Sequence, residues 1–219
     1  MDLVVYKLGG SLLSWNDLAD HLNAVLELRG NGRSLIIVGG GAVTDIVRHW
    51  SDVYLLPQET AHWIAVQSLA INRALVRHLL IDSREVASRQ SAESEWKIRP
   101  GPLLLDVELY LREAEKNDHN PLPHHWNATS DSIAAWVASR WMADELVLLK
   151  STDAPTTIDV EEAAHLGLID PLFPELAAGL PQVHWCNLRS QPPIISAWFQ
   201  NSQRLSNSTL APPERSAEF

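Results

Sequence analysis

The sequence predicts an α/β protein with a mainly parallel sheet, and two observations carry that prediction. Near the N-terminus, an apolar run followed by glycines and then by a helical pattern occurs twice. Residues 126–153 then read as a polar turn, a helix and an apolar run rich in Val and Leu. Such runs are typical of interior parallel strands, which are covered on both faces. With 219 residues and 46% hydrophobic content, the chain can form one large domain or two small lobes.

The first unit starts with a predicted strand over Leu3–Leu8, which leads into the sequence KLGGSLL. Ser14 is placed to cap the helix that follows, because apolar residues recur at helical spacing from Leu18 to Leu26. Gly30 is placed to end that helix, since glycine readily adopts the left-handed backbone found at helix C-termini.

The second unit has a predicted strand over Ser34–Val38, and Ala42–Trp50 is predicted to be helical. Five of the ten glycines lie in the two turns, at Gly9, Gly10, Gly39, Gly40 and Gly41. Unhindered N–H groups at a helix N-terminus form a site for anionic oxygens, and Lys7 adds a positive charge beside the first turn. Each turn taken alone is also compatible with a simple tight bend. Neither G-x-x-x-x-G-K-[ST] nor G-x-G-x-x-G occurs, so the sequence does not indicate a Walker-type or Rossmann nucleotide site.

The helix predicted within residues 126–153 carries a second group of polar residues. Thr129 or Ser130 is placed to cap it, and Asp131 falls in its first turn. Glu145–Leu149 is the predicted interior strand, and Lys150 follows its carboxyl end. Ligands of open α/β sheets bind at those ends, so Asp131 and Lys150 are candidates for chemistry. The alternatives are that Asp131 only stabilises the start of the helix and that Lys150 is a solvated strand end.

A long amphipathic helix is predicted over Thr60–Leu80. Most of its apolar residues are expected in the core, and His62 is a candidate contact of a ligand pocket. Arg73 or Arg77 is a candidate partner for an anionic ligand, because guanidinium groups bind such anions through paired donors. A solvated face or a subunit contact is the alternative for each of these residues.

The remaining segments are assigned from composition and pattern. Residues 81–102 turn polar and are predicted to form a loop or a mobile helix, as a candidate lid. Residues 158–180 are predicted to be helices and loops, and Val183–Cys186 an edge strand. Residues 201–219 have the composition of a disordered tail.

Charge and cysteine content exclude several classes of protein. The net charge of -10 argues against a general nucleic-acid or membrane-surface binder. No apolar run approaches the ~20 residues needed to span a bilayer. A single cysteine, Cys186, excludes an internal disulfide and fits a reducing compartment, so we expect a cytoplasmic protein. The nine histidines include no pair at i, i+4 spacing, so no metal site is predicted from protein ligands.

Four motifs occur in an order that resembles the amino acid kinase family, which includes aspartokinase-like and uridylate kinase-like proteins. They are KLGGS, IIVGGGAVTDIVR, TSDSIAA and LVLLKSTD, and together they cover roughly residues 3–153 with gaps. Within the family, LPHHWNATSDSIAAW followed by LVLLKSTD is most similar to the kinase that phosphorylates (5-(aminomethyl)furan-3-yl)methyl phosphate in the methanofuran pathway.

The resemblance implies a three-layer αβα sandwich, and we expect a single domain over residues 1–200. The acceptor would be bound by roughly residues 1–125 and the nucleotide by residues 126–200. The implied activity is transfer of the γ-phosphate of ATP, with Mg²⁺, to a small-molecule phosphate. Family members are commonly homo-oligomers, so we expect one here, without a nucleic-acid or membrane partner.

The resemblance also implies roles for individual residues. The candidate catalytic residues are Lys7, Asp131 and Lys150, with Asp131 holding the lysines in place. The candidate ATP and phosphate contacts are Gly9, Gly10, Ser11 and Asp153. The candidate acceptor contacts are Gly39, Gly40, Gly41, His62, Asn127, Thr129 and Ser130.

The sequence departs from the family pattern after the strand that Lys150 follows. Many members carry a second catalytic lysine further along the chain, whereas no lysine follows Lys150 here. Either Lys150 supplies the second charge, or an arginine or a metal does, or the protein binds without efficient transfer. A kinase for another phosphate or carboxylate, and a non-catalytic nucleotide- or oxyanion-binding protein, are therefore the alternative functions.

Overall fold

The computed structural model describes residues 2–30, 32–155 and 157–200, and it contains a seven-stranded sheet in the order β3-β4-β2-β1-β5-β6-β7. All neighbouring strands are parallel except β6 and β7, so the prediction of a mainly parallel sheet is confirmed. The strands are β1 (Leu3–Leu8), β2 (Arg33–Val38), β3 (Arg84–Val86), β4 (Gly101–Leu105), β5 (Glu145–Lys150), β6 (Gln182–Asn187) and β7 (Ile195–Gln200). The predicted tail over residues 201–219 lies outside the described residues.

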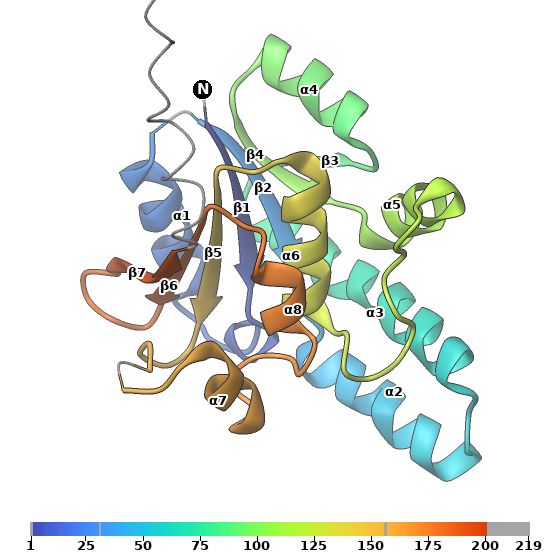
Figure 1. Cartoon of the computed structure of the whole chain (residues 1–219). Coiled ribbons are helices and arrows are strands. Elements are labelled where there is room, and N and C mark those ends of the chain that lie inside the picture. Colours follow the sequence, from blue (N-terminus) through green and yellow to red (C-terminus); the bar gives the residue numbers. More distant parts are fainter. Residues whose placement is uncertain (1, 31, 156, 201–219) are drawn as a thin grey trace, which may run out of the picture.

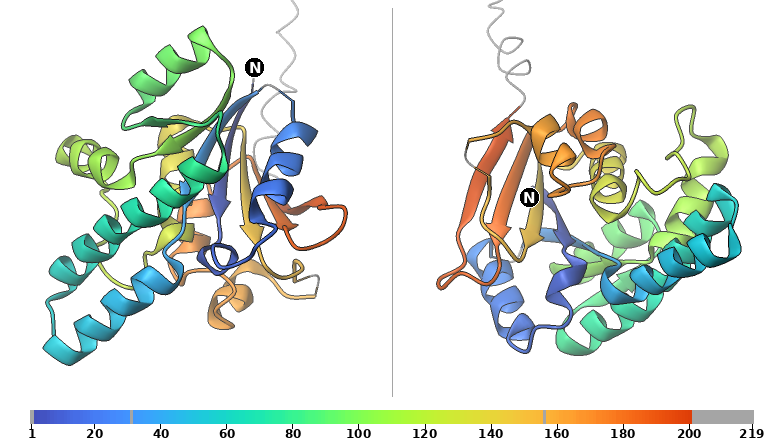
Figure 2. Two further views of the ribbon diagram at one scale, coloured as in Figure 1. Left: turned by 180° about the vertical axis from the view of Figure 1, so that it is seen from behind. Right: turned by 90° about the horizontal axis from the view of Figure 1, so that it is seen from below.

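Helices cover both faces of this sheet and give three layers (Figures 1 and 2). The α-helices are α1 (Leu18–Leu28), α2 (Gly41–Tyr54), α3 (Gln58–Leu79), α4 (Arg89–Ile98), α5 (Val107–Ala114), α6 (Ser130–Trp141), α7 (Val160–His165) and α8 (Phe173–Ala177). Two short 3-10 helices are η1 (Gly10–Leu12) and η2 (Glu115–Asn117). Helix α1 packs on one face and α6 with α8 on the other, and α2 and α3 form a pair of helices that extends beyond the strand ends.

The alternation of side chains along β1 determines where its lysine points. Val4, Tyr6 and Leu8 are buried in the core beneath α1. Leu3 and Val5 are buried in the opposite core, beneath α6. Because successive side chains of a strand point to opposite faces, Lys7 projects toward the α6 layer.

Strand β5 follows the same rule beside β1. Leu146 and Leu148 lie in the α6 core, whereas Val147 and Leu149 lie in the α1 core. Lys150 therefore points toward α6, as Lys7 does. Both strands end at the lower edge of the sheet in Figure 1, near η1, α2 and α7.

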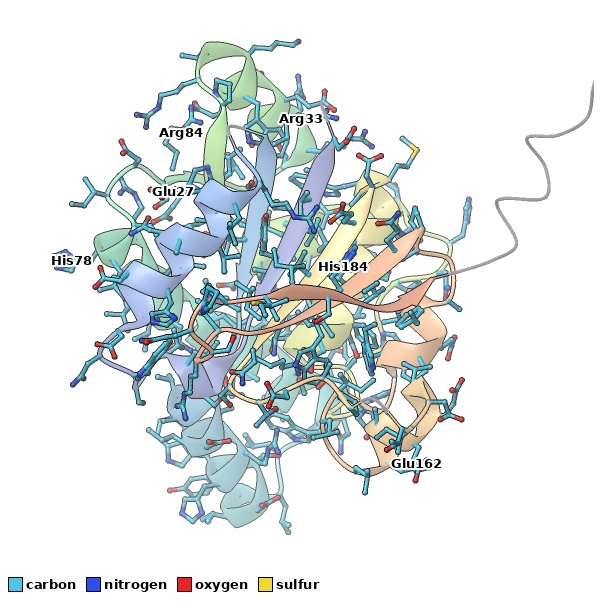
Figure 3. The ribbon with its side chains drawn as sticks, turned by 90° about the vertical axis from the view of Figure 1, so that its left-hand side faces the viewer. Glu27, Arg33, His78, Arg84, Glu162 and His184 are labelled. Atoms are coloured by element: carbon cyan, nitrogen blue, oxygen red, sulfur yellow. The ribbon has the colours of Figure 1, made fainter. Side chains whose placement is uncertain are left out.

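Charged groups hold the N-terminal end of β5, which lies away from the carboxyl ends of the strands. Arg29, just after α1, makes an ion pair with Glu145 at 2.7 Å. His184 of β6 lies beside β5 (Figure 3), with its Nδ1 3.5 Å from a Glu145 carboxylate oxygen. These contacts join α1, β5 and β6 at the start of β5.

Most predicted elements are present, with α2 five residues longer than expected, but three predictions need correction. Ser14 does not cap α1, because residues 10–17 form η1 and a turn, and the helix starts at Leu18. Residues 81–102 form β3, α4 and the start of β4, so a helix is present there, as one of the two expected forms. The candidate lid is wrong, because α4 lies at the end of the sheet away from the carboxyl ends of β1 and β5 (Figure 1). Strand β6 is not an edge, since β7 pairs with it.

No helix among the described residues is long and apolar enough to cross a membrane.

Candidate functional site

The strand order places a crossover between β1 and β5. The chain leaves β1 toward β2 on one side and later returns to β5 on the other side. Loops that leave such neighbouring strands in opposite directions open a crevice at the carboxyl ends, where ligands of open α/β sheets bind. The polar groups described next all gather at this crevice.

Asp131 joins the two lysines at the centre of the crevice. Its Oδ1 is 2.9 Å from the Nζ of Lys7, and its Oδ2 is 2.8 Å from the Nζ of Lys150. Lys150 also donates a hydrogen bond of 2.9 Å to the backbone carbonyl of Leu168. Asp131 is 4% exposed and Lys7 is 5% exposed, so the charges are held away from bulk water. We call Lys7, Asp131 and Lys150 the lysine–aspartate triad.

The pKa values of Asp131 and Lys150 are shifted within the triad. Burial alone would raise the pKa of Asp131, but the charges of Lys7 and Lys150 outweigh it and lower that pKa to about 2. Burial and the charge of Lys7 lower the pKa of Lys150 below its ordinary value. The triad thus holds two ammonium groups and one carboxylate together at the crevice.

The two glycine turns pack directly against each other. A Cβ added to Gly10 would lie 2.1 Å from the backbone nitrogen of Gly41, and one added to Gly41 would lie 2.6 Å from the carbonyl oxygen of Gly10. Gly41 also has a positive φ of 50°. Gly9 and Gly39 donate hydrogen bonds of 2.8 Å each to the carbonyls of Leu149, near the end of β5, and Leu8, at the end of β1. Close packing of the turns leaves room only for glycine, which by itself accounts for these residues as tight turns. The same geometry is also compatible with an anion site.

Asn72 of α3 fixes the second glycine turn. Its side-chain amide donates hydrogen bonds of 2.8 Å to the carbonyl of Gly39 and 2.6 Å to that of Gly40. Asn72 is 4% exposed, so these bonds are shielded from water. The only hint in the sequence is a polar residue on the buried side of an amphipathic helix.

A cavity of about 440 Å³ is lined by Ser130, the sequence neighbour of Asp131, and by Gly10 and Ser11, which follow β1. The three triad residues themselves do not line it. It is bounded by the two glycine turns, by α2 and α3, and by the segment that leads into α6. At its rim, the guanidinium carbon of Arg48 lies 4.8 Å from the ring centre of Trp126. Among the candidate residues, Gly10, Ser11, Gly40, Gly41, His62, Thr129 and Ser130 line this cavity.

His62 lies in the wall of the cavity and is buried against other rings. It stacks on His124 with ring centres 4.4 Å apart. Burial, followed by the neighbouring His124, lowers the pKa of His62 to about 4, so the ring is neutral at physiological pH. His124 is held between Glu59 at 2.6 Å and Glu115 at 3.0 Å. The segment between η2 and α6 is therefore held against α3 and η2 through His124.

The start of α6 is capped by a residue from elsewhere in the chain. Asp170, in the segment between α7 and α8, accepts hydrogen bonds from the backbone N–H groups of Thr129 at 3.0 Å and Ser132 at 2.9 Å. It also accepts a hydrogen bond from the Thr129 hydroxyl at 2.5 Å. Thr129 is the N-cap residue of α6, as predicted, but its side chain accepts no cap hydrogen bond.

The loop after β5 faces the first glycine turn. Ser151 and Ser11 share a hydrogen bond of 3.1 Å between their hydroxyls. Asp153 accepts a hydrogen bond of 2.9 Å from Asn187 at the end of β6. Trp185 donates a hydrogen bond of 2.8 Å to the carbonyl of Thr152. These contacts hold the loop after β5 against the first glycine turn and against β6.

Some candidates lie apart from the cavity. Arg73 forms ion pairs with Glu85 and Asp106, and Arg77 donates to the carbonyl of Ile81. Gly39, Asn127 and Asp153 do not line the 440 Å³ cavity, and the Asn127 backbone carbonyl accepts a hydrogen bond from Leu172.

Sequence reasoning missed Asp170, Arg48 and Trp126 as parts of the site. The local signal for Asp170 is an acidic residue among apolar residues, and that for Arg48 is a charged residue on an amphipathic helix. Trp126 is an aromatic residue in a polar turn. Within residues 2–30, 32–155 and 157–200, no group of three or more His, Cys, Asp or Glu side chains is arranged to hold a metal ion.

Comparisons with known proteins agree with this arrangement. A model of the amino acid kinase family matches residues 2–157. Uridylate kinase from Archaeoglobus fulgidus has a similar structure, with a TM-score of 0.57 and 17% identity over 84% of this chain and 90% of that chain. UMP kinase from Bacillus anthracis has a TM-score of 0.60 and 14% identity over 86% of this chain and 87% of that chain.

Aspartate kinase from Synechocystis is also similar, with a TM-score of 0.60 and 14% identity. The alignment covers 90% of this chain but 41% of that longer chain. At these identities the likeness to solved structures indicates a shared fold. A search of curated protein sequences found no match.

Proposed function

Because the chain belongs to the amino acid kinase family and is a phosphotransferase, we propose that it transfers the γ-phosphoryl group of ATP to a small-molecule phosphate monoester. The observation that carries this proposal is the lysine–aspartate triad, which lies beside two packed glycine turns and a 440 Å³ cavity. In the proposed reaction, an acceptor phosphate oxygen forms a bond to the γ-phosphorus. The bond from that phosphorus to the β–γ bridging oxygen breaks, and ADP leaves with the electron pair.

The role proposed for the triad is electrostatic. Phosphoryl transfer passes through a loose transition state with charge on the equatorial oxygens, so positioning and charge stabilisation dominate catalysis. Lys7 and Lys150 supply positive charge from adjacent strands, and Asp131 keeps both ammonium groups in fixed places. Pre-organised charges of this kind need no rearrangement during the reaction.

Asp131 is unsuited to act as a general base. Both of its oxygens face lysine ammonium groups, and the pKa of its carboxyl group is lowered to about 2. A phosphate acceptor is already ionised near neutral pH and needs no proton removed. The chemistry of Asp131 therefore fits a phosphate acceptor better than an alcohol that must be deprotonated.

The proposed acceptor lies in the cavity with its phosphate toward the backbone N–H groups of the glycine turns. Gly40, Gly41, Thr129, Ser130 and His62 line that space, as expected for acceptor contacts. Our best candidate for the acceptor is (5-(aminomethyl)furan-3-yl)methyl phosphate, whose product would be the diphosphate. This choice rests on the sequence resemblance, and the volume of the cavity is compatible with a molecule of that size.

We propose that the ATP phosphates bind along Gly9, Gly10 and Ser11, between the triad and the loop after β5. The hydroxyl of Ser11 faces that loop through Ser151. Mg²⁺ is proposed to arrive with the nucleotide, because this ion is usually held by substrate phosphates, water and at most one or two carboxylates. The described residues offer no cage of their own for it.

The position of Lys150 bears on the alternative of a non-catalytic binding protein. That alternative drew its support from the absence of a lysine further along the chain. Lys150 makes a contact with Asp131 like that of Lys7, which supports a second catalytic charge supplied from β5. No observation favours the alternative, and the experiment below distinguishes the two.

The test is a phosphorus-31 NMR time course with ATP, Mg²⁺ and the furan phosphate, and with an acceptor-free control. Diphosphate signals that grow together with ADP only when the acceptor is present would support the proposal. ADP formed with another phosphate but not with the furan compound would overturn the acceptor and keep the reaction class. Intact ATP with every phosphate or carboxylate acceptor, together with a nucleotide-dependent rise in Tm, would leave the binding-protein alternative.

We also propose that the protein is a cytoplasmic homo-oligomer. The surface that best supports assembly is an apolar stripe on α2, where Ile46, Trp50 and Val53 are 50%, 48% and 55% exposed. Light scattering of the purified protein tests this, and a Trp50→Glu variant should have a smaller mass. A wild-type protein that is monomeric at all concentrations would overturn it.

A further inference from the structure

We infer that Asp170 is a positioning residue for phosphoryl transfer, through which the segment between α7 and α8 holds the lysine–aspartate triad in place. The inference rests on the proposed function. Asp170 touches none of the triad side chains directly in the described contacts. Instead, it binds the first turn of the helix that carries Asp131.

The contacts of Asp170 are built into the core of the site. Its carboxylate accepts three hydrogen bonds, from the Thr129 and Ser132 N–H groups and from the Thr129 hydroxyl. These groups lie on either side of Asp131 in the sequence. The carboxylate therefore fixes the backbone from which Asp131 projects, and it satisfies N–H groups at the N-terminus of α6 that have no partner within the helix.

The same segment contacts the other end of the triad. Leu168, two residues before Asp170, accepts a hydrogen bond of 2.9 Å from Lys150 through its backbone carbonyl. Leu172, two residues after it, donates a hydrogen bond of 3.1 Å to the Asn127 carbonyl. Residues 168–172 therefore fix Lys150, the base of Asp131 and the wall of the acceptor cavity together.

Charge supports this assignment. Asp170 is 9% exposed, and burial together with the charge of Asp131 raises its pKa. The charge of Asp170 in turn partly offsets the lowering of the Lys150 pKa. Two carboxylates and two ammonium groups are thus buried in one network. Since buried charges are stable only when they are paired and hydrogen-bonded, removal of one member should move the others.

The position of Asp170 also restricts where phosphate can bind. The N-terminus of an α-helix is a common site for anions. Here the carboxylate of Asp170 already occupies the N–H groups of Thr129 and Ser132. The acceptor phosphate therefore cannot use these two N–H groups, which favours the glycine turns as its binding site.

The test compares Asp170→Ala and Asp170→Asn with the matched control Asp159→Asn. Asp159 is an exposed carboxylate that caps α7 through the N–H of Glu162 at 2.8 Å, and it contacts no triad residue in the described bonds. We expect Asp170→Ala to lower kcat about 100-fold, as misplaced catalytic groups do, with KM for ATP changed by less than about threefold. The control should retain wild-type kinetics. Asp170→Asn, which keeps the size and an acceptor oxygen, provides a folded variant if the alanine form is unstable.

A readout without substrates uses lysine NMR. The chain has only four lysines, Lys7, Lys97, Lys116 and Lys150, so lysine labelled with carbon-13 at Cε gives four signals. Substitution of Asp170 should shift the signals of Lys7 and Lys150 and leave those of the other two in place. A folded Asp170→Asn protein with unshifted lysine signals and a kcat within about twofold of wild type would overturn the inference. If the wild type phosphorylates no acceptor, the proposed function fails, whereas the lysine signals still test whether Asp170 positions the triad.

Discussion

Lys150 Nζ lies 2.8 Å from Asp131 Oδ2, on the oxygen opposite the one that faces Lys7. The two lysines come from adjacent parallel strands whose positions 8 and 149 are paired, so the sheet itself places them on the same face. The carboxylate lies between them at the start of α6. A second cation is thus supplied from the end of β5, although no lysine occurs further along the chain.

Replacement of Lys150 should therefore abolish most of the activity. We expect Lys150→Met to lower kcat about 100- to 1000-fold, the usual cost of removing one pre-organised group that stabilises transition-state charge. The matched control is Lys116→Met, because Lys116 is 61% exposed and pairs with Glu113 at the surface. ADP release measured at saturating ATP and acceptor is the assay. Wild-type kcat in the Lys150 variant would mean that Lys150 has only a structural role.

The contact between the glycine turns should not tolerate a side chain. Gly10→Ala would place a Cβ 2.1 Å from the Gly41 nitrogen, so one turn must move. We expect a loss of about 1 to 3 kcal/mol in unfolding free energy, as for other overpacked sites, together with loss of activity. The matched control is Gly179→Ala, where an added Cβ meets nothing within 4 Å. Thermal unfolding followed by circular dichroism measures both variants, and equal Tm values would refute the predicted clash.

The hydrogen bonds of Asn72 should contribute to both stability and acceptor binding. Asn72→Ala leaves the carbonyls of Gly39 and Gly40 without their buried donor, which should cost about 1 to 3 kcal/mol. Urea unfolding gives the free energy, and KM for the acceptor should rise because the second glycine turn is no longer held.

The control for this variant is Gln67→Ala on the same helix. Gln67 is exposed and donates to Glu108 at the surface, so its loss should change the unfolding free energy by no more than about 0.5 kcal/mol. Both substitutions introduce alanine into α3, which makes the change in helix propensity similar. If the two variants unfold at the same urea concentration, Asn72 does not hold the turn.

His62 should remain neutral throughout the physiological range. Its pKa is lowered to about 4 by burial and by His124, so its NMR signals should titrate near pH 4 and not near 6.5. Because the unfolded chain binds this proton more readily, the contribution to stability is complete above pH 6.5 and is lost as the pH falls toward 4.

The acid dependence of stability provides the corresponding comparison. A His62→Gln variant lacks this group, so its unfolding free energy should fall less steeply between pH 6.5 and 4 than that of the wild type. The slope is measured by urea unfolding at a series of pH values. Identical slopes, or a His62 midpoint near 6.5, would contradict the buried and neutral state.

Several parts of the fold could be predicted from the sequence. Strands β1, β2 and β5 and the two glycine turns are visible because apolar runs and glycines are local signals. The start of α6 is predicted within one residue of Thr129, and Asp131 lies in its first turn. The period of two along a strand also determines that Lys7 and Leu8 face opposite layers.

Other parts depend on residues far apart in the chain. Residues 81–102 read as a polar loop or a mobile helix, because α4 buries only Ala92 and Trp96 and therefore has a weak apolar pattern. The edge position predicted for β6 was wrong because β7 adds to it by backbone pairing, which carries little sequence signal.

The sequence by itself determined the strands, the glycine turns and the face toward which each lysine points, because these follow from periods of two and 3.6 residues. Only the tertiary structure decided that Lys150 reaches Asp131, that Asn72 holds the second glycine turn and that Asp170 caps α6. The contact of Lys150 with Asp131 joins two side chains 19 positions apart. The other two join a side chain to a backbone group 33 or 38 positions away. A local pattern specifies which way a side chain points, whereas its partner depends on how the elements pack.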